Sequence, residues 1–364
     1  MSIPGRILGL MGWIIAGMVG AQSPLPLDST PLVIPDGVVP PKYTAAIGVD
    51  ELPPDLSAKA DRVVTRRLEG EYLLLAVRGL PQSYAISGTV PQLGPIGGTQ
   101  TIPSGYESGF RVGFGLQTAD SGADAVLRYT YYSNQSDTSV ASPGIINPDP
   151  AALYMPPRNV FPTLTVPGLV AAVATANAQS NVTFYLGDFE IGQSYQAFDW
   201  SESLLLRIFA GGRFANMSQN LTATYNGGDV DFDTVSRKIT FNGGGLRLGG
   251  SIENSFGGNW GYRFTGSASL ITGAFAGSQT EVANNAYVLS ITDKYVGVVP
   301  IADLGLAITY RSGGWNLSVG YEFQNWFNML QGFNIVDDSN PAKLMRDIGG
   351  IGFDGMALRA EYVW

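Results

Sequence analysis

The last nine residues, 356–364, read MALRAEYVW, and their side chains alternate in character. Met, Leu, Ala, Tyr and Trp occupy every second position, and Arg359 and Glu361 lie between them. Residues 315–323 (WNLSVGYEF) repeat the pattern, with Trp, Leu, Val, Tyr and Phe opposite Asn, Ser, Gly and Glu. Because successive side chains of a strand point to opposite faces, both stretches predict β-strands with one apolar and one polar face.

The same alternation recurs along most of the chain. Helical membrane spans need runs of about 18 or more apolar residues, and the sequence after residue 21 contains none. We therefore expect ten strands, near residues 71–79, 108–118, 124–134, 181–199, 204–219, 237–256, 259–275, 296–312, 314–330 and 350–364.

The connections between these strands alternate between long and short. The long ones are 80–107, 135–180, 220–236, 276–295 and 331–349, and the short ones are 119–123, 200–203, 257–258 and 311–314. Outer-membrane barrels have an even number of strands, short periplasmic turns and longer external loops. The sequence therefore predicts an all-β fold, a closed antiparallel transmembrane β-barrel of about ten strands (range 8–12) with both termini in the periplasm.

The amino-acid composition excludes several classes of function. Charged residues make up 14% of the chain, below the roughly 25% typical of soluble domains. The net charge of −9, without basic clusters, argues against nucleic acid as a partner. The chain has no His and no Cys, which excludes His-dependent triads, thiolate nucleophiles and the common zinc sites. We expect no enzymatic activity and no cofactor.

The N-terminal region predicts export. Residues 1–21 combine Arg6, a short apolar stretch and small residues at their end, as in a cleaved signal peptide. Residues 22–66 are rich in proline, which prevents ladder pairing and predicts an extended periplasmic leader. Residues 67–364 then form the barrel. We expect it in the bacterial outer membrane, in contact with membrane lipid and lipopolysaccharide; a monomer and a homo-oligomer both remain open.

The final aromatic strand resembles the assembly signal with which bacterial outer-membrane barrels end. Tyr362 and Trp364 are its candidate residues. This resemblance implies the barrel-assembly machinery as a partner.

Several segments resemble the Legionella-type major outer membrane protein family. They are residues 189–194 (FEIGQS), 206–214 (LRIFAGGRF), 241–249 (FNGGGLRLG), 266–273 (GSASLITG) and 317–327 (LSVGYEFQNWF). The resemblance covers roughly 181–364 well, 108–135 loosely and the leader not at all. It implies an outer-membrane β-barrel with porin-like, pore-forming activity.

Charged residues on the inward face are the candidates for lining a pore, because Arg on the lipid face would cost about 2–4 kcal/mol at the midplane. They can set ion preference in a narrow lumen, or pair with one another and fill it. A structural barrel with a mostly plugged lumen is therefore one alternative to a pore. A surface adhesin is the other, because the loop 135–180 is long and rich in Pro, Ala, Thr and Asn. By strand parity the candidates are Arg128, Glu190, Arg207, Arg213, Arg247, Glu253, Arg263, Asp303, Glu322, Arg359 and Glu361.

One external loop carries a metal-like spacing. Asp229, Asp231 and Asp233 stand at i, i+2 and i+4, as in loops whose oxygens converge on Ca²⁺. A weak Ca²⁺ site and a solvated acidic loop are the two interpretations.

Overall fold

A computed structural model describes residues 64–80, 83–89, 96–118, 121–142, 159–198, 201–335 and 344–364. The predicted signal peptide (1–21) and almost all of the predicted leader (22–66) lie outside these residues. No helix in the described part of the chain is long and apolar enough to cross a membrane.

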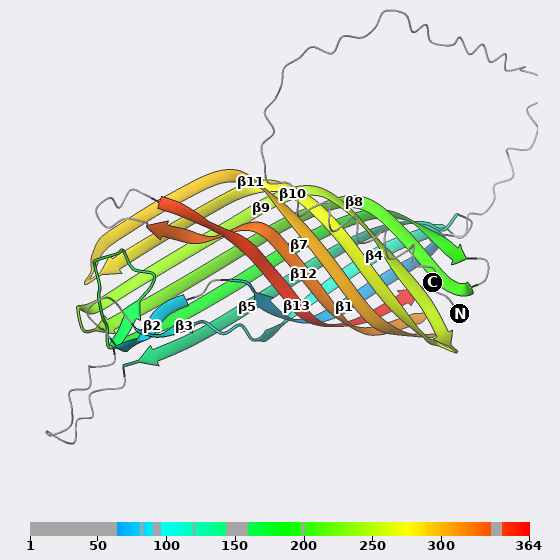
Figure 1. The fold of residues 1–364 in the computed structure, drawn as a ribbon. Coiled ribbons are helices and arrows are strands. Elements are labelled where there is room, and N and C mark those ends of the chain that lie inside the picture. The colour runs from blue at the N-terminus through cyan, green and yellow to red at the C-terminus, as the bar shows by residue number, and fades with distance from the viewer. Residues whose placement is uncertain are drawn as a thin grey trace, which may run out of the picture. The chain divides into compact units, whose positions relative to one another are not determined.

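Ten antiparallel strands close into a barrel, which confirms the predicted fold (Figure 1). Around the ring their order is β1, β13, β12, β11, β10, β9, β8, β7, β5 and β4. The first strand starts at Val64, three residues before the predicted start of the barrel. The strands are β1 (Val64–Arg78), β4 (Tyr106–Thr118), β5 (Ala123–Ala141), β7 (Thr175–Phe198), β8 (Ser201–Gly227), β9 (Val230–Gly257), β10 (Trp260–Ala283), β11 (Ala286–Ser312), β12 (Trp315–Ile335) and β13 (Leu344–Val363).

The ring closes between the first and the last strand. β1 pairs with β13 from Arg67 opposite Val363 to Arg78 opposite Gly352. The terminal Trp364 extends this seam by two backbone hydrogen bonds. Its amide donates to the Arg66 carbonyl at 3.0 Å, and its carbonyl accepts from the Arg66 amide at 2.9 Å. No edge is left at this point of the barrel, as a membrane-spanning sheet requires.

The predicted alternation of faces is confirmed. Leu317, Val319 and Leu358 are exposed on the outside of the ring, whereas Arg207 and Glu361 are buried inside it. Outward aromatic rings lie beside the short turns and the C-terminus, where the centroids of Trp260 and Tyr310, and of Trp315 and Tyr362, are 4.9 Å apart. Such rings favour the membrane interface, so this end carries an aromatic girdle.

The prediction of long external loops at 220–236 and 276–295 is wrong, because both stretches are strands joined by a two-residue turn. The described residues of a third predicted loop, 331–349, are also strand. β8 passes to β9 through Gly228 and Asp229, and β10 to β11 through Asn284 and Asn285. Asn284 and Asn285 have φ of 47° and 67°, which suits a two-residue hairpin turn. The outward residues of β8 change to Asn, Ser and Thr from Asn216 onward. Apolar alternation therefore stops where the membrane ends, while the hydrogen-bonded ladder continues above it.

The other two long connections build a cap, defined here as residues 83–89, 96–101 and 159–174. Its strands are β2 (Ser83–Thr89), β3 (Ile96–Thr101) and β6 (Asn159–Pro162), in the order β3, β2, β6. β2 and β3 lie at the end of the barrel opposite the C-terminus (Figure 1). Buried side chains of the cap pack against the inner face of β7, β8 and β9, and they include Tyr84, Val160 and Val170 facing Leu221, Ala223 and Val235.

We expect the two ends of the barrel to differ in access from outside the cell. Tyr287 lies beside the β10–β11 turn at the extended end and Ser312 lies at the short β11–β12 turn; both are exposed. Because the native chain has no thiol, Tyr287→Cys should react with an impermeant maleimide on intact cells, and Ser312→Cys only after the outer membrane is opened. Labelling of Ser312→Cys alone on intact cells would invert this topology.

Candidate functional site in the barrel lumen

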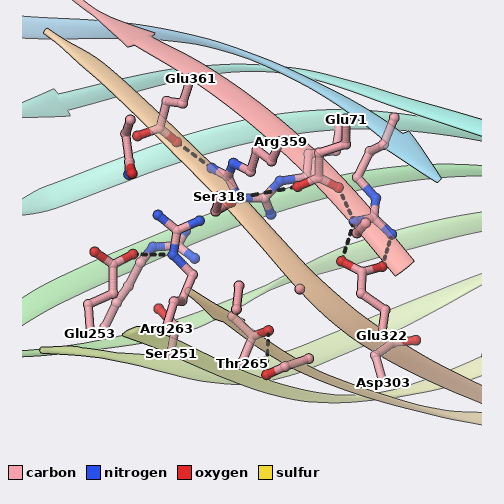
Figure 2. A pocket seen from close by; sticks show the side chains of 18 of the residues that line it. Glu71, Ser251, Glu253, Arg263, Thr265, Asp303, Ser318, Glu322, Arg359 and Glu361 are labelled. Carbon is pink, nitrogen blue, oxygen red and sulfur yellow. Dashed lines mark hydrogen bonds and ion pairs between the residues drawn. The ribbon is translucent and has the colours of Figure 1, made fainter. Parts of the chain in front are cut away.

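A cavity of about 620 Å³ occupies the lumen at the end of the barrel where the β11–β12 turn and the C-terminus lie (Figure 2). The β11–β12 turn, Asn259 and Val363 contribute to its wall, which places it at the end of the barrel that carries the C-terminus. All eleven charged residues that strand parity assigned to the inward face line this cavity: Arg128, Glu190, Arg207, Arg213, Arg247, Glu253, Arg263, Asp303, Glu322, Arg359 and Glu361.

Glu190 on β7 is the most heavily paired carboxylate of the cavity. Its side chain is 0% exposed, and its oxygens lie 2.8 Å from Arg128, 3.1 Å from Arg207 and 3.3 Å from Arg247. The three guanidinium groups come from β5, β8 and β9, so one carboxylate ties four strands together. A charge buried in this way is compensated only while all these partners remain.

A second carboxylate, Asp303 on β11, collects the next group of partners. It lies 2.9 Å from Arg213 and 2.6 Å from Arg247, and it accepts hydrogen bonds from Ser267 and Gln324, each at 2.7 Å. Arg213 also pairs with Asp188 at 2.6 Å. β8 and β11 are three places apart in the ring, so these ion pairs cross the lumen as well as following its wall.

The remaining two predicted arginines pair within one strand or between neighbouring strands. Figure 2 shows Arg359 with Glu361 and Arg263 with Glu253. Arg359 also pairs with Glu69 and Glu71 of β1. Each of the six predicted arginines therefore has a carboxylate partner, and the wall that they form is a mixed-charge network.

Strand parity missed six ion-paired residues of this network: Glu69, Glu71, Arg111, Asp124, Asp188 and Arg311. The guanidinium of Arg111 donates two hydrogen bonds to the Glu322 carboxylate, each at 3.0 Å, and it also pairs with Glu71. Arg111 and Asp188 lie between outward aromatic or apolar residues in strands that were predicted, so the alternation alone could have found them. Glu69 precedes the predicted first strand and could be placed only once β1 was known to start at Val64.

Beyond the charged cavity the lumen is closed by aromatic side chains. Phe184 and Trp326 have ring centroids 6.0 Å apart, although β7 and β12 are five places apart in the ring of ten and thus face each other. Phe353 and Tyr132 complete this aromatic layer, with Phe184 4.8 Å from Phe353 and Tyr132 5.7 Å from Phe353. The Tyr132 hydroxyl is satisfied because it donates to the Leu75 carbonyl at 2.6 Å.

β12 turns inward just above this layer. Its pairing with β11 ends at Trp326, its register with β13 shifts after Trp326 and again after Leu330, and Asn328 has a φ of 59°. Residues 329–333, called here the inward segment, are all buried. Two of its backbone carbonyls accept hydrogen bonds from side chains of β8 and β9, Leu330 from Gln219 at 3.1 Å and Gln331 from Arg237 at 3.2 Å.

The Asp229–Asp233 spacing does not produce the predicted Ca²⁺ loop. Asp229 accepts hydrogen bonds from the Ala171 and Ala172 amides at 3.0 and 2.9 Å, Asp231 is exposed and Asp233 is buried. These residues belong to a turn and a strand, in which alternate positions lie about 7 Å apart, so the carboxylates do not converge. Among the described residues no group of three or more acidic side chains could hold a metal ion.

Tyr362 and Trp364, the predicted assembly residues, lie on the outside of the barrel. Both are exposed, and their rings are stacked with centroids 5.8 Å apart. Trp364 also provides the last hydrogen bonds of the seam with Arg66.

The sequence model of the Legionella pneumophila major outer membrane protein precursor matches residues 76–363. The chain belongs to this family. It is therefore an outer-membrane protein, as predicted. The family match covers nearly all of the barrel, including both strands whose alternation decided the fold, and it confirms the resemblance of the individual segments.

Solved structures similar to this family member are outer-membrane β-barrels of low sequence identity. The outer membrane protease OmpT from Escherichia coli has a TM-score of 0.48 and 9% identity, over 82% of this chain and 97% of that one. The deltaS2S3 mutant of the TodX monoaromatic hydrocarbon channel has a TM-score of 0.31 and 9% identity, over 82% and 90%. A Pseudomonas aeruginosa FadL homologue has a TM-score of 0.22 and 8% identity, over 83% and 90%. No curated protein matches the chain.

Proposed function

We propose that the protein is a passive, porin-like pore for ions or small solutes, described here in a closed conformation. The observation that carries the proposal is the abrupt change along the lumen. A charge-lined cavity of about 620 Å³ ends at a layer of aromatic side chains, which belongs to a larger buried apolar core. The cavity supplies a hydrated, mixed-charge path of the kind that ions can follow. This core, the inward segment and the cap separate it from the extended end.

The closure rests on the least regular part of the barrel. β12 departs from β11 after Trp326 and shifts register twice within the inward segment. Bulges of this type bend a strand and re-aim its side chains. The inward segment still pairs with β13, from Met329 opposite Gly349 to Phe333 opposite Arg346, but it has no ladder with β11 on its other side. Its displacement would therefore break strand pairing on one side only.

The second candidate is a structural barrel with a permanently plugged lumen. It is favoured by the contact between Phe184 and Trp326 from opposite strands and by ion pairs that cross the lumen. The two functions differ in what happens when the aromatic layer is removed, because a plugged barrel keeps its ion-pair network and the remaining packing.

Conductance across planar bilayers separates the candidates. We expect refolded wild-type protein to show brief openings, and Phe184→Ala combined with Trp326→Ala to increase the open probability several-fold. Phe323→Ala is the matched control, since Phe323 is an exposed aromatic on the same strand. Heat-modifiable migration on gels verifies that each variant is folded. Silence of both the wild type and the double variant would establish the plugged barrel.

A further inference from the structure

Two buried carboxylates near the cap have no cation beside them among the residues that the structure describes. Asp233 on β9 and Glu281 on β10 are both 0% exposed. Among the described residues, no well-formed hydrogen bond reaches either oxygen of Asp233 or Oε1 of Glu281. The Thr234 amide next to Asp233 offsets only part of the effect of burial on its carboxylate. Oε2 of Glu281 accepts one hydrogen bond, from the Val166 amide of the cap at 2.8 Å. No ion pair of either residue occurs within the described part of the chain.

The two carboxylates share one face of neighbouring strands. Asp233 lies opposite Ala283, and Glu281 lies opposite Val235, so the acidic residues are diagonal neighbours two positions apart. Tyr225 lies directly opposite Asp233 on the other side, on β8. Its hydroxyl donates to the Tyr84 carbonyl of the cap at 2.7 Å, which leaves the phenolic oxygen able to accept or to coordinate. Three oxygen-bearing side chains from three adjacent strands thus lie together beneath the cap.

The surrounding charges do not neutralise this group. Arg237 lies on the same face of β9, but its guanidinium donates to Gln279 Oε1 at 3.1 Å and to the Gln331 carbonyl at 3.2 Å. Asp347 is a further acidic residue, and its negative charge interacts electrostatically with Arg237. Burial raises the pKa of Asp233 to about 6 and that of Glu281 to about 7, and the neighbouring Asp233 adds to the second shift.

These shifts have a definite sign. A carboxyl group whose pKa is higher in the folded state than in the unfolded state makes the protein less stable as the pH rises. Without a counter-ion, this end of the barrel would lose stability from about pH 4 to about pH 7. A bound cation would remove this penalty at neutral pH, since it favours the charged form of both groups.

We propose that Asp233, Glu281 and Tyr225 form a binding site for one divalent cation, Ca²⁺, that fastens the cap to the barrel wall. Carboxylate and hydroxyl oxygens are hard ligands, and Ca²⁺ accepts an irregular set of six to eight oxygens that water can complete. Two carboxylates balance the charge of one such ion. Glu281 transmits binding to the cap through Val166, and Tyr225 through Tyr84. Asp229 and Asp231 take no part.

The test uses the full-length protein refolded in an uncharged detergent, so that no lipopolysaccharide competes for the metal. Calorimetric titration with CaCl₂ at pH 7.5 should give one Ca²⁺ per chain. Ca²⁺ should also raise the midpoint of thermal unfolding and slow proteolysis within the cap. Asp233→Asn combined with Glu281→Gln should abolish all three effects, and Asp231→Asn, an exposed carboxylate on the same strand, should retain them.

Two results would overturn the site. The first is equal Ca²⁺ binding by the wild type and the double variant. The second is no Ca²⁺ binding by the wild type, together with a double variant that at pH 7.5 without metal reaches the stability of the wild type at pH 5. That second result would show that protons, and not a metal ion, neutralise the two carboxylates. Neither result depends on whether the lumen conducts.

Discussion

Glu190→Gln is expected to lower the free energy of unfolding by about 3–5 kcal/mol, the usual cost of removing one partner from a buried ion pair. The substitution keeps the shape of the side chain and removes its charge. Arg128, Arg207 and Arg247 would then lose a shared counter-ion, whose carboxylate has no exposed surface in the folded barrel. Denaturant unfolding in detergent micelles, followed by tryptophan fluorescence, measures the change.

Asp293→Asn is the matched control for this prediction. It also converts an ion-paired carboxylate to its amide, but Asp293 and its partner Arg346 lie at the surface, where their side chains are 20% and 42% exposed. Exposed pairs contribute little, so the control should unfold close to the wild type. Equal midpoints for Glu190→Gln and Asp293→Asn would show that water enters the cavity well enough to solvate the three arginines.

Deletion of residues 362–364 is expected to reduce the amount of folded barrel in the outer membrane several-fold. The deletion removes the ring contacts of Tyr362 with Trp315 and Trp364 and the two hydrogen bonds between Trp364 and Arg66. It also removes the terminal aromatic residue that we propose the assembly machinery recognises. The measurement is the intensity of the heat-modifiable band in purified outer membranes.

Trp364→Phe separates the two causes. It retains a terminal aromatic and both backbone hydrogen bonds, so the yield should stay near that of the wild type. Trp364→Ala retains the hydrogen bonds alone, and a yield as low as that of the deletion would assign the defect to the lost ring. Full assembly of the deleted chain would contradict both roles.

The membrane-spanning half of the fold could be predicted because two solvents act on each strand there. Lipid selects apolar residues such as Leu317 and Val319 on one face, and the lumen selects polar residues such as Asn316 and Glu322 on the other. Above the membrane this contrast disappears. Asn216 and Ser218 face water outside the barrel, so the continuation of β8 resembles a polar loop in the sequence.

The sequence could predict which residues line the candidate site, but it could not predict which of them form ion pairs. Parity placed Arg213 and Asp303 on the inside, but their contact at 2.9 Å depends on how far strands β8 and β11 are from each other across a barrel of ten strands. The aromatic layer was missed for another reason. Phe184 and Trp326 have the same parity as Glu190 and Glu322 on their strands, so the alternation places them inside, but only charged residues were considered on the inward face.

The seam between β1 and β13 has a consequence for the order of folding. It joins residues from the two ends of the described chain, such as Arg67 and Val363, whereas every other junction of the ring joins strands that follow one another among the strands of the barrel. Contacts between residues so distant in the sequence require a large loss of chain entropy and form slowly. Closure of the seam is then the slow kinetic step, and until it occurs both end strands expose unpaired edges that can recruit other chains.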